Sequence, residues 1–275
     1  MDWDPFNRRK QNTPTEANPS LNLRRIKRDI TTILNDPPRG VTAVVDEDDM
    51  NYLHCLIKGT ENTPYGGGFF YFVVFFPPNY PFDPPKVKLM TTGGGTVRFN
   101  PNFYESGKVC LSILNTWSGP EWTPAQNISS VLVTIQSIMN EKPYYNEPGT
   151  YDKGKHLIEA DKYNVYIQYE TFRVAVVGML DNDYSINLPQ HLLQVMEKDF
   201  LNNYEFYDST VTQRCCHNGK RLECAELRFI RNSVNINYNT IKRRMKDIRE
   251  RLNVKYAVGS AVYKNPEIIV IDDSD

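Results

Sequence analysis

Charge of one sign, long apolar runs and a secretory leader are all missing from this sequence. Its 275 residues carry 32 Lys and Arg against 33 Asp and Glu, a net charge of -1, which gives no general reason to expect nucleic acid binding. No apolar stretch reaches the ~18 residues that a membrane-spanning helix needs, so we expect no membrane partner. The acidic start, Met1 to Pro5, lacks the apolar segment of a signal peptide. We therefore expect a cytoplasmic or nuclear protein.

Cysteines are few and odd in number. Without a leader, scattered cysteines indicate reduced thiols rather than a disulfide framework; they are Cys55, Cys110, Cys215, Cys216 and Cys224. The last three, together with His217, are the only group resembling zinc ligands. Because two of these cysteines are adjacent and no second His follows at a useful distance, we predict no metal site.

Histidine is equally scarce, with four residues, none of them near Cys110 in the chain. A cysteine hydrolase usually pairs its nucleophile with a His that lowers the thiol pKa. A hydrolase is therefore disfavoured, although only a structure can exclude spatial proximity. The Gly triplets at 66–68 and 93–95 lack the Lys-Ser/Thr of a phosphate-binding loop, so we expect no ATP site and no cofactor.

The chain divides into an arm, a mixed domain and an extension. Residues 1–20 are polar and rich in Pro, which predicts a disordered arm. Helical periodicity over 21–34 is followed by four short β-type segments, 41–45, 52–58, 69–76 and 86–91, separated by turn residues. Consecutive strands of this kind predict an antiparallel meander. Further helical patterns at 129–139 and 161–180 complete an α+β domain over residues 21–182.

The remaining residues need not belong to that domain. Two helical patterns, 188–207 and 238–252, predict a helical C-terminal extension over 183–254, and residues 255–275 are predicted to be a flexible tail.

Three segments in a fixed order carry the chemistry: Tyr80 to Lys86, Asn100 to Leu114, and Trp122 to Ala125. Taken singly, an isolated Cys is usually a small core residue and Asn-Pro-Asn is a turn. Together, in this order and spacing, they resemble the ubiquitin-conjugating (E2) enzymes, over residues 20–182. The resemblance implies the ubiquitin-conjugating (UBC) fold, with an N-terminal helix, a four-stranded antiparallel meander and C-terminal helices.

The resemblance also implies a reaction. An E2 accepts ubiquitin or a ubiquitin-like modifier from an activating enzyme (E1) as a cysteine thioester, here on Cys110, and passes it to a substrate lysine, usually with a ligase (E3). ATP is consumed by the E1. One subfamily, which also has a long C-terminal extension, is associated with a non-standard E1, so that partner is included in the expectation. The alternative is a non-catalytic ubiquitin-binding adaptor of the same fold, although such adaptors lack the cysteine.

Four residues are expected to form the catalytic site. Besides Cys110, the resemblance assigns Asn102 to stabilise an oxyanion or to brace the loop. The family's His-Pro-Asn motif has Asn100 in place of its His, as in the subfamily with the extension. Ser112 stands where the family often has Asp, so Glu147 and its neighbour Asn146 are the candidates for orienting the acceptor lysine.

Three further sets of residues are candidate partner surfaces. The resemblance implies an E1 contact through the basic first helix and an E3 contact through two loops, with a solvated helix surface and core packing as the respective alternatives. The sets are Arg24, Arg25 and Arg28 for the E1, and Phe82, Pro124 and Ala125 for the E3.

The tail provides the third set. The β-branched run Ile268, Ile269, Val270 and Ile271, followed by acids, resembles a SUMO-interacting motif, because a short strand can add to an exposed sheet edge. A final strand that pairs within the extension is the alternative.

Overall fold

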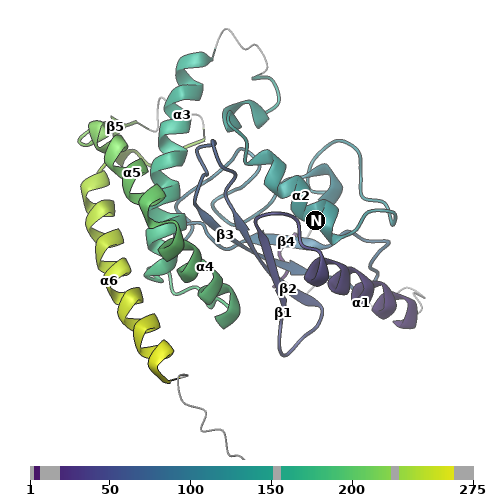
Figure 1. The fold of residues 1–275 in the computed structure, drawn as a ribbon. Coiled ribbons are helices and arrows are strands. Elements are labelled where there is room, and N and C mark those ends of the chain that lie inside the picture. The colour runs from purple at the N-terminus through teal and green to yellow at the C-terminus, as the bar shows by residue number, and fades with distance from the viewer. Residues whose placement is uncertain (1–2, 7–18, 151–155, 224–228, 263–275) are drawn as a thin grey trace, which may run out of the picture.

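The computed structural model describes residues 3–6, 19–150, 156–223 and 229–262 (Figure 1). Its centre is an antiparallel sheet in the order β1-β2-β3-β4, formed by Val41–Val45, Tyr52–Lys58, Phe69–Phe75 and Lys86–Leu89. The predicted meander is confirmed, and the first two strands have the predicted bounds. The mixed α+β architecture of the UBC fold is confirmed as well.

Strand β3 is buried along its whole length because both faces of the sheet are covered. Phe70, Phe72 and Val74 belong to a core cluster with residues of α1 (Pro19–Asn35), α2 (Ile128–Ile138) and α3 (Leu157–Glu170). The alternate side chains, including Phe69 and Tyr71, pack with α4 (Gln190–Asn202), α5 (Tyr204–Arg214) and α6 (Tyr238–Val262). The extension therefore closes the second face of the sheet, and Figure 1 shows its helices grouped on one side of the molecule.

The junction between α3 and the extension is a π-helical segment, Thr171–Gly178. It replaces the second half of the single helix predicted over 161–180. Buried Phe172, Val176 and Val177 from this segment pack in the same cluster as α4 to α6. The chain thus passes from one face of the sheet to the other without leaving the core.

The helices of the extension differ from the predicted ones in their bounds. The pattern at 188–207 is two helices, α4 and α5, which are separated at Asn203, where the backbone leaves the helical region with ψ at 21°. Helix α6 continues to Val262, past the predicted end of the extension at 254. Lys255 and Tyr256, predicted to lie in the flexible tail, both bond the Glu197 carboxylate, at 2.6 and 2.7 Å. Two short strands, β5 (Arg221–Leu222) and β6 (Val234–Asn235), were not predicted.

The start of the chain also differs from the prediction of a disordered arm over residues 1–20. The Lys88 ammonium lies 2.8 Å from Asp4 Oδ2 and 5.7 and 5.3 Å from the ring centroids of Trp3 and Phe6. An ion pair and two cation–π contacts therefore hold residues 3–6 against β4. Residues 7–18 of the predicted arm, most of the tail including 268–271, and Cys224 lie outside the described residues. Within the described ranges, no helix has the length and apolar character needed to cross a bilayer.

Candidate active site

Cys110 lies in the irregular segment between β4 and a 3-10 turn, Ser112–Leu114. The Cys110 N–H donates to the carbonyl of Asn102 at 2.9 Å, and Asn102 Nδ2 donates back to the carbonyl of Cys110 at 2.7 Å. These reciprocal bonds fix the backbone on both sides of the cysteine. Cys110 itself is buried, at 2% exposure.

Asn100 is fully buried and holds the other end of the loop. Its Nδ2 donates to the Tyr65 hydroxyl at 2.8 Å and to the carbonyl of Ile138 at 2.9 Å. Its Oδ1 accepts from the Asn102 N–H at 3.0 Å and from Asn146 Nδ2 at 3.3 Å. An amide at this position can both donate and accept, so Asn100 links the loop to β3's neighbouring turn and to the end of α2.

The charge state of the Cys110 thiol reflects opposing influences. Burial raises its pKa above the ordinary value, and the charges of Lys108 and Arg98 and a hydrogen bond from Tyr104 offset part of that rise. Sequence reasoning missed Arg98 and Tyr104, although both flank the Asn-Pro-Asn motif. With a raised pKa, Cys110 is mostly a neutral thiol near pH 7, which suits a group that reacts only when an activated thioester is brought to it.

The hydrolase alternative needs an imidazole beside the thiol. His54 Nε2 and Nδ1 instead bond Asp46 Oδ2 at 2.9 Å and the Tyr71 hydroxyl at 2.7 Å. The His217 ring nitrogen is 3.0 Å from Lys220 Nζ. No histidine is among the groups that shift the Cys110 pKa within the described part of the chain. The geometry therefore lacks the Cys-His pair of a cysteine hydrolase.

Comparison with known proteins decides the family. A family model described as ubiquitin-conjugating enzyme matches residues 25–171, which include the whole Cys110 loop. The chain belongs to the ubiquitin-conjugating enzymes. It is 48% identical over 231 residues to ubiquitin-conjugating enzyme E2 Z of Danio rerio, covering 84% of this chain and 69% of that protein. The Xenopus tropicalis E2 Z is 44% identical over 254 residues, 92% of this chain and 79% of the relative. The human E2 Z is 53% identical over 201 residues, 73% and 56% of the two chains.

In this E2, the two candidates for lysine orientation have different environments. Asn146 Nδ2 donates to the carbonyl of Ile138 at 2.8 Å, and its Oδ1 accepts from Asn140 at 2.9 Å. Its amide is thus engaged in the network that supports Asn100. Glu147 follows the short turn Pro143–Asn146 and is half-buried. Its role in orienting a lysine stays a prediction.

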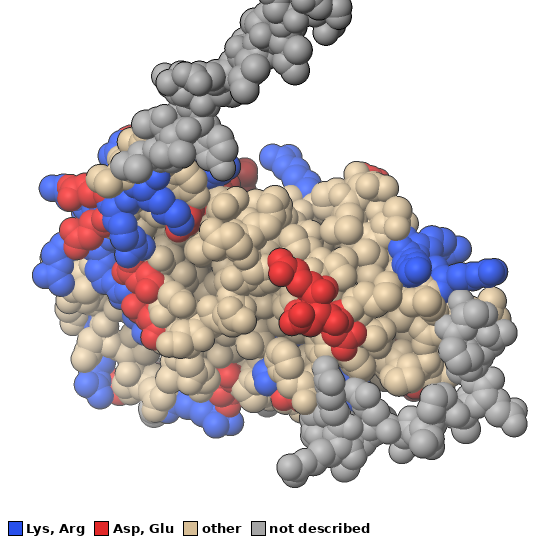
Figure 2. Space-filling view, turned by 90° about the horizontal axis from the view of Figure 1, so that it is seen from below, with Lys and Arg blue, Asp and Glu red and all other residues tan. Residues whose placement is uncertain are grey.

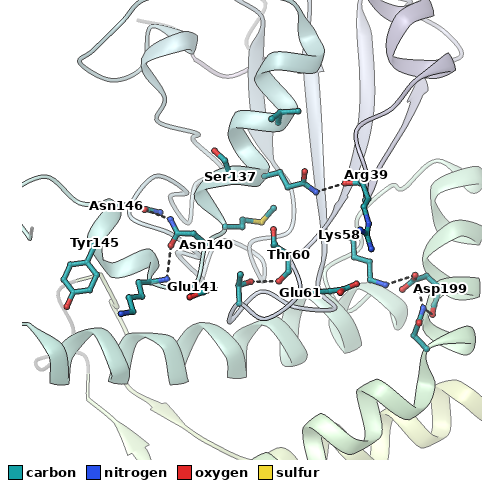
Figure 3. Close-up of a pocket in the computed structure, with 18 of the residues that line it drawn as sticks. Arg39, Lys58, Thr60, Glu61, Ser137, Asn140, Glu141, Tyr145, Asn146 and Asp199 are labelled. Atoms are coloured by element: carbon teal, nitrogen blue, oxygen red, sulfur yellow. Dashed lines mark hydrogen bonds and ion pairs between the residues drawn. The ribbon is translucent and has the colours of Figure 1, made fainter. Parts of the chain in front are cut away.

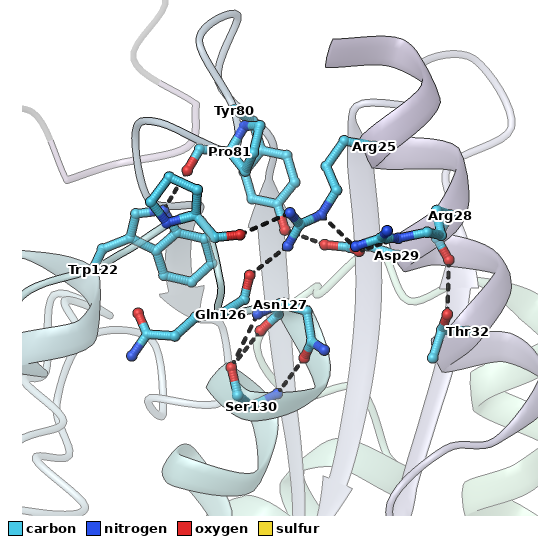
Figure 4. Close-up of polar contacts among 11 residues, drawn as sticks. Arg25, Arg28, Asp29, Thr32, Tyr80, Pro81, Trp122, Gln126, Asn127 and Ser130 are labelled. Carbon is cyan, nitrogen blue, oxygen red and sulfur yellow. Dashed lines mark hydrogen bonds and ion pairs between the residues drawn. The ribbon is translucent and has the colours of Figure 1, made fainter. Parts of the chain in front are cut away.

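The structure brings the two predicted E3-binding loops together. Trp122 Nε1 donates to the carbonyl of Pro81 at 2.7 Å, which ties the loop after Cys110 to the proline-rich loop (Figure 4). Phe82 is 69% exposed next to this contact, and Pro124 and Ala125 are exposed on the other loop. An exposed aromatic ring on a fixed loop is a common feature of a small contact surface.

The three arginines proposed for the E1 contact do not share one environment. Arg24 and Arg28 are exposed, whereas the Arg25 side chain is 14% exposed. Arg25 Nε lies 2.9 Å from Asp29 Oδ1, and its other nitrogens donate to the carbonyls of Pro124, at 2.8 Å, and Gln126 (Figure 4). Arg25 therefore joins α1 to the loop before α2. Figure 2 shows Lys and Arg gathered at the end of the molecule where α1 lies.

A second cavity of about 1310 Å³ lies where the conjugating domain meets the extension (Figure 3). Lys58 of β2 and Asp199 of α4 point toward each other at its edge, with Nζ and Oδ1 2.8 Å apart. Asn146 is among the lining residues and Cys110 is not. Its walls come from both parts of the chain, so sequence patterns gave no indication of it.

Proposed function

We propose that Cys110 is the residue of this E2 that carries ubiquitin, or a ubiquitin-like modifier, as a thioester and passes it to a substrate lysine. The observation that carries the proposal is the reciprocal hydrogen bonding between Cys110 and Asn102, which fixes the cysteine in the loop that the family model covers. A core cysteine with a packing role only would not require this arrangement of the backbone.

The chemistry consists of two acyl transfers. The Cys110 thiolate attacks the thioester carbonyl of the modifier on the E1, forming a new C–S bond while the E1 thiolate leaves. The amine of a substrate lysine then attacks the Cys110 thioester, loses a proton, and releases the Cys110 thiolate. Both steps pass through an oxyanion that a nearby amide can stabilise.

Asn102 is the proposed donor to that oxyanion. In the free enzyme its Nδ2 donates to the carbonyl of Cys110, so the side chain braces the loop. The Oδ1 of Asn102 is buried without a hydrogen-bond partner among the described residues. That unsatisfied atom favours a change in the side chain's bonding once an acyl group occupies the thiol. Glu147 is proposed to orient the lysine.

The partner surfaces follow from exposure. Arg24 and Arg28 are proposed to meet an acidic surface of the E1, whether the standard or the non-standard enzyme, and Phe82, Pro124 and Ala125 to meet an E3. SUMO binding by Ile268 to Ile271 is proposed on the sequence alone. We place the reaction in the cytoplasm or nucleus, with no cofactor on this chain, because ATP is used by the E1.

A charging assay tests the proposal. The protein is incubated with ATP, ubiquitin and each E1 and analysed on non-reducing gels beside Cys110→Ser, Cys110→Ala and Cys216→Ala, whose thiol is exposed elsewhere. The expected result is a thiol-sensitive adduct on the wild type and on Cys216→Ala, a thiol-resistant one on Cys110→Ser, and none on Cys110→Ala. Absence of any adduct from folded wild-type protein with every E1 and modifier would favour the adaptor.

A further inference from the structure

The extension reaches the catalytic loop through a short segment that precedes β6. Phe229 and Ile230 are buried, at 5% and 7% exposure, in the same core cluster as Phe99 and Phe103 of the loop. The extension therefore contacts two regions that are distinct in the fold: the far face of the sheet through its helices, and the surroundings of Cys110 through this segment.

Phe229 is held firmly by aromatic neighbours of the conjugating domain. Its ring centroid lies 5.6 Å from that of Tyr144 and 5.5 Å from that of Tyr163, with both pairs edge to face. Aromatic pairs of this geometry are favourable beyond the area that they bury. Phe229 thus provides a fixed surface on which a catalytic-loop side chain can rest.

That side chain is Arg98. Its guanidinium carbon lies 3.9 Å from the ring centroid of Tyr104 and 5.3 Å from that of Phe229, both within the cation–π range. One of its terminal nitrogens also donates to the carbonyl of Pro101 at 2.6 Å. The planar guanidinium is therefore fixed between a residue of the loop and a residue of the extension.

A second contact of the extension lies beside the first. Arg231 forms an ion pair with Glu105, the residue after Tyr104. The Tyr104 N–H donates to the carbonyl of Lys108 at 3.0 Å, which closes the turn leading to Cys110. The extension thus contacts Tyr104's neighbour on the chain as well as the cation that stacks on its ring.

Tyr104 and Arg98 act directly on the thiol. The groups that oppose the effect of burial on the Cys110 pKa are Lys108, Arg98 and Tyr104, the last through a hydrogen bond. Two of these three groups are held in place by Phe229 and Arg231 or by their partners.

We propose that Phe229 and Arg231 of the extension are positioning residues for the active site, which hold Arg98 and Tyr104 beside the Cys110 thiol. The extension then sets the reactivity of the thiol as well as covering the sheet. This inference rests on the proposed function of Cys110 as the acyl carrier.

The test measures the reactivity of Cys110 without any partner protein. The alkylation rate of Cys110 by iodoacetamide, quantified on its own peptide by mass spectrometry, is followed against pH for the wild type and four variants. Phe229→Leu keeps a buried apolar side chain but removes the ring that faces Arg98. Arg231→Ala removes the ion pair, and Tyr104→Phe removes only the hydroxyl. The matched control is Arg249→Ala, which removes an extension cation 4.1 Å from the Tyr104-independent ring of Tyr204.

Loss of the Tyr104 hydrogen bond raises the Cys110 pKa, so Tyr104→Phe should shift the midpoint upward by about one pH unit and slow alkylation at pH 7 roughly tenfold. Phe229→Leu should shift it in the same direction by about half as much on this scale. Arg231→Ala should shift it less, since exposed ion pairs are weak. Arg249→Ala should leave the wild-type profile unchanged.

Wild-type profiles for all variants would overturn the inference. A shift in Tyr104→Phe combined with none in Phe229→Leu and Arg231→Ala would overturn the role of the extension. A fall in melting temperature without a change in the profile would show that these residues only stabilise the fold. End-point charging by an E1 is measured in parallel on the wild type. Its failure would refute the proposed function, whereas the alkylation profiles would still report on the positioning residues.

Discussion

Phe200 gives the sharpest test of whether the extension and the conjugating domain form one folding unit. It is fully buried in α4, with ring centroids 5.6 and 5.1 Å from those of Tyr204 and Tyr207. These rings belong to the cluster that covers the sheet. Replacing a buried Phe with Ala costs about 3–5 kcal/mol. For a protein of this size that corresponds to a fall in melting temperature on the order of 10 °C.

The distribution of tryptophan makes the assay selective. The three tryptophans, Trp3, Trp117 and Trp122, all precede the extension in sequence. Tryptophan fluorescence therefore reports on the conjugating domain, whereas far-UV circular dichroism reports on all helices. In urea, Phe200→Ala should move both transitions to the same lower midpoint. The same substitution at Phe82, which is 69% exposed, should change stability by about 0.5 kcal/mol or less.

The reasoning would be refuted if Phe200→Ala shifted the circular dichroism transition and left the fluorescence transition at the wild-type midpoint. That result would mean that α4 to α6 unfold separately and that their packing on the sheet contributes little to the stability of the conjugating domain.

Three further predictions concern the loop, pH and the E3 surface. Asn100→Ala leaves several buried groups without partners, so we expect a loss of about 2–3 kcal/mol in urea unfolding; wild-type stability would contradict this. The Asp46 pKa is lowered from 3.8, mainly by its hydrogen bond with His54, so its contribution is present above that pH and lost as pH falls through the lowered value. The stability difference between wild type and Asp46→Asn should therefore shrink below about pH 4, and a difference that grows there would refute the assignment. Phe82→Ala should leave E1 charging unchanged and reduce E3-stimulated discharge, and equal stimulation would argue against this E3 surface.

Local sequence patterns were sufficient for the sheet and the catalytic loop. Strands β1 and β2 have the predicted bounds because turn residues flank them on both sides. The loop with Asn102 and Cys110 was found because its motif is contiguous in the chain. The resemblance to the E2 enzymes supplied the fold and the activity, and the family match confirms both.

Features that depend on distant pairing were not predictable in the same way. Arg25 has the sequence context of an exposed basic helix, yet carbonyls about a hundred positions away bind its guanidinium. Phe229 and Arg231 are far from Arg98 and Glu105 in sequence, so no periodicity connects them. Residues 3–6 likewise lie against the sheet only because Lys88 is there to meet them. In each case the deciding contact is tertiary.

Single-turnover discharge tests the central claim most directly. The wild-type protein is charged with ubiquitin by the E1 that supports charging, the E1 is stopped by removing ATP, and free lysine is added while intact mass is followed. The account predicts loss of the Cys110 adduct at a rate that rises with lysine concentration, together with the appearance of a ubiquitin–lysine amide. Release of free ubiquitin at a rate independent of lysine would instead identify a hydrolytic thioester and contradict a role in conjugation.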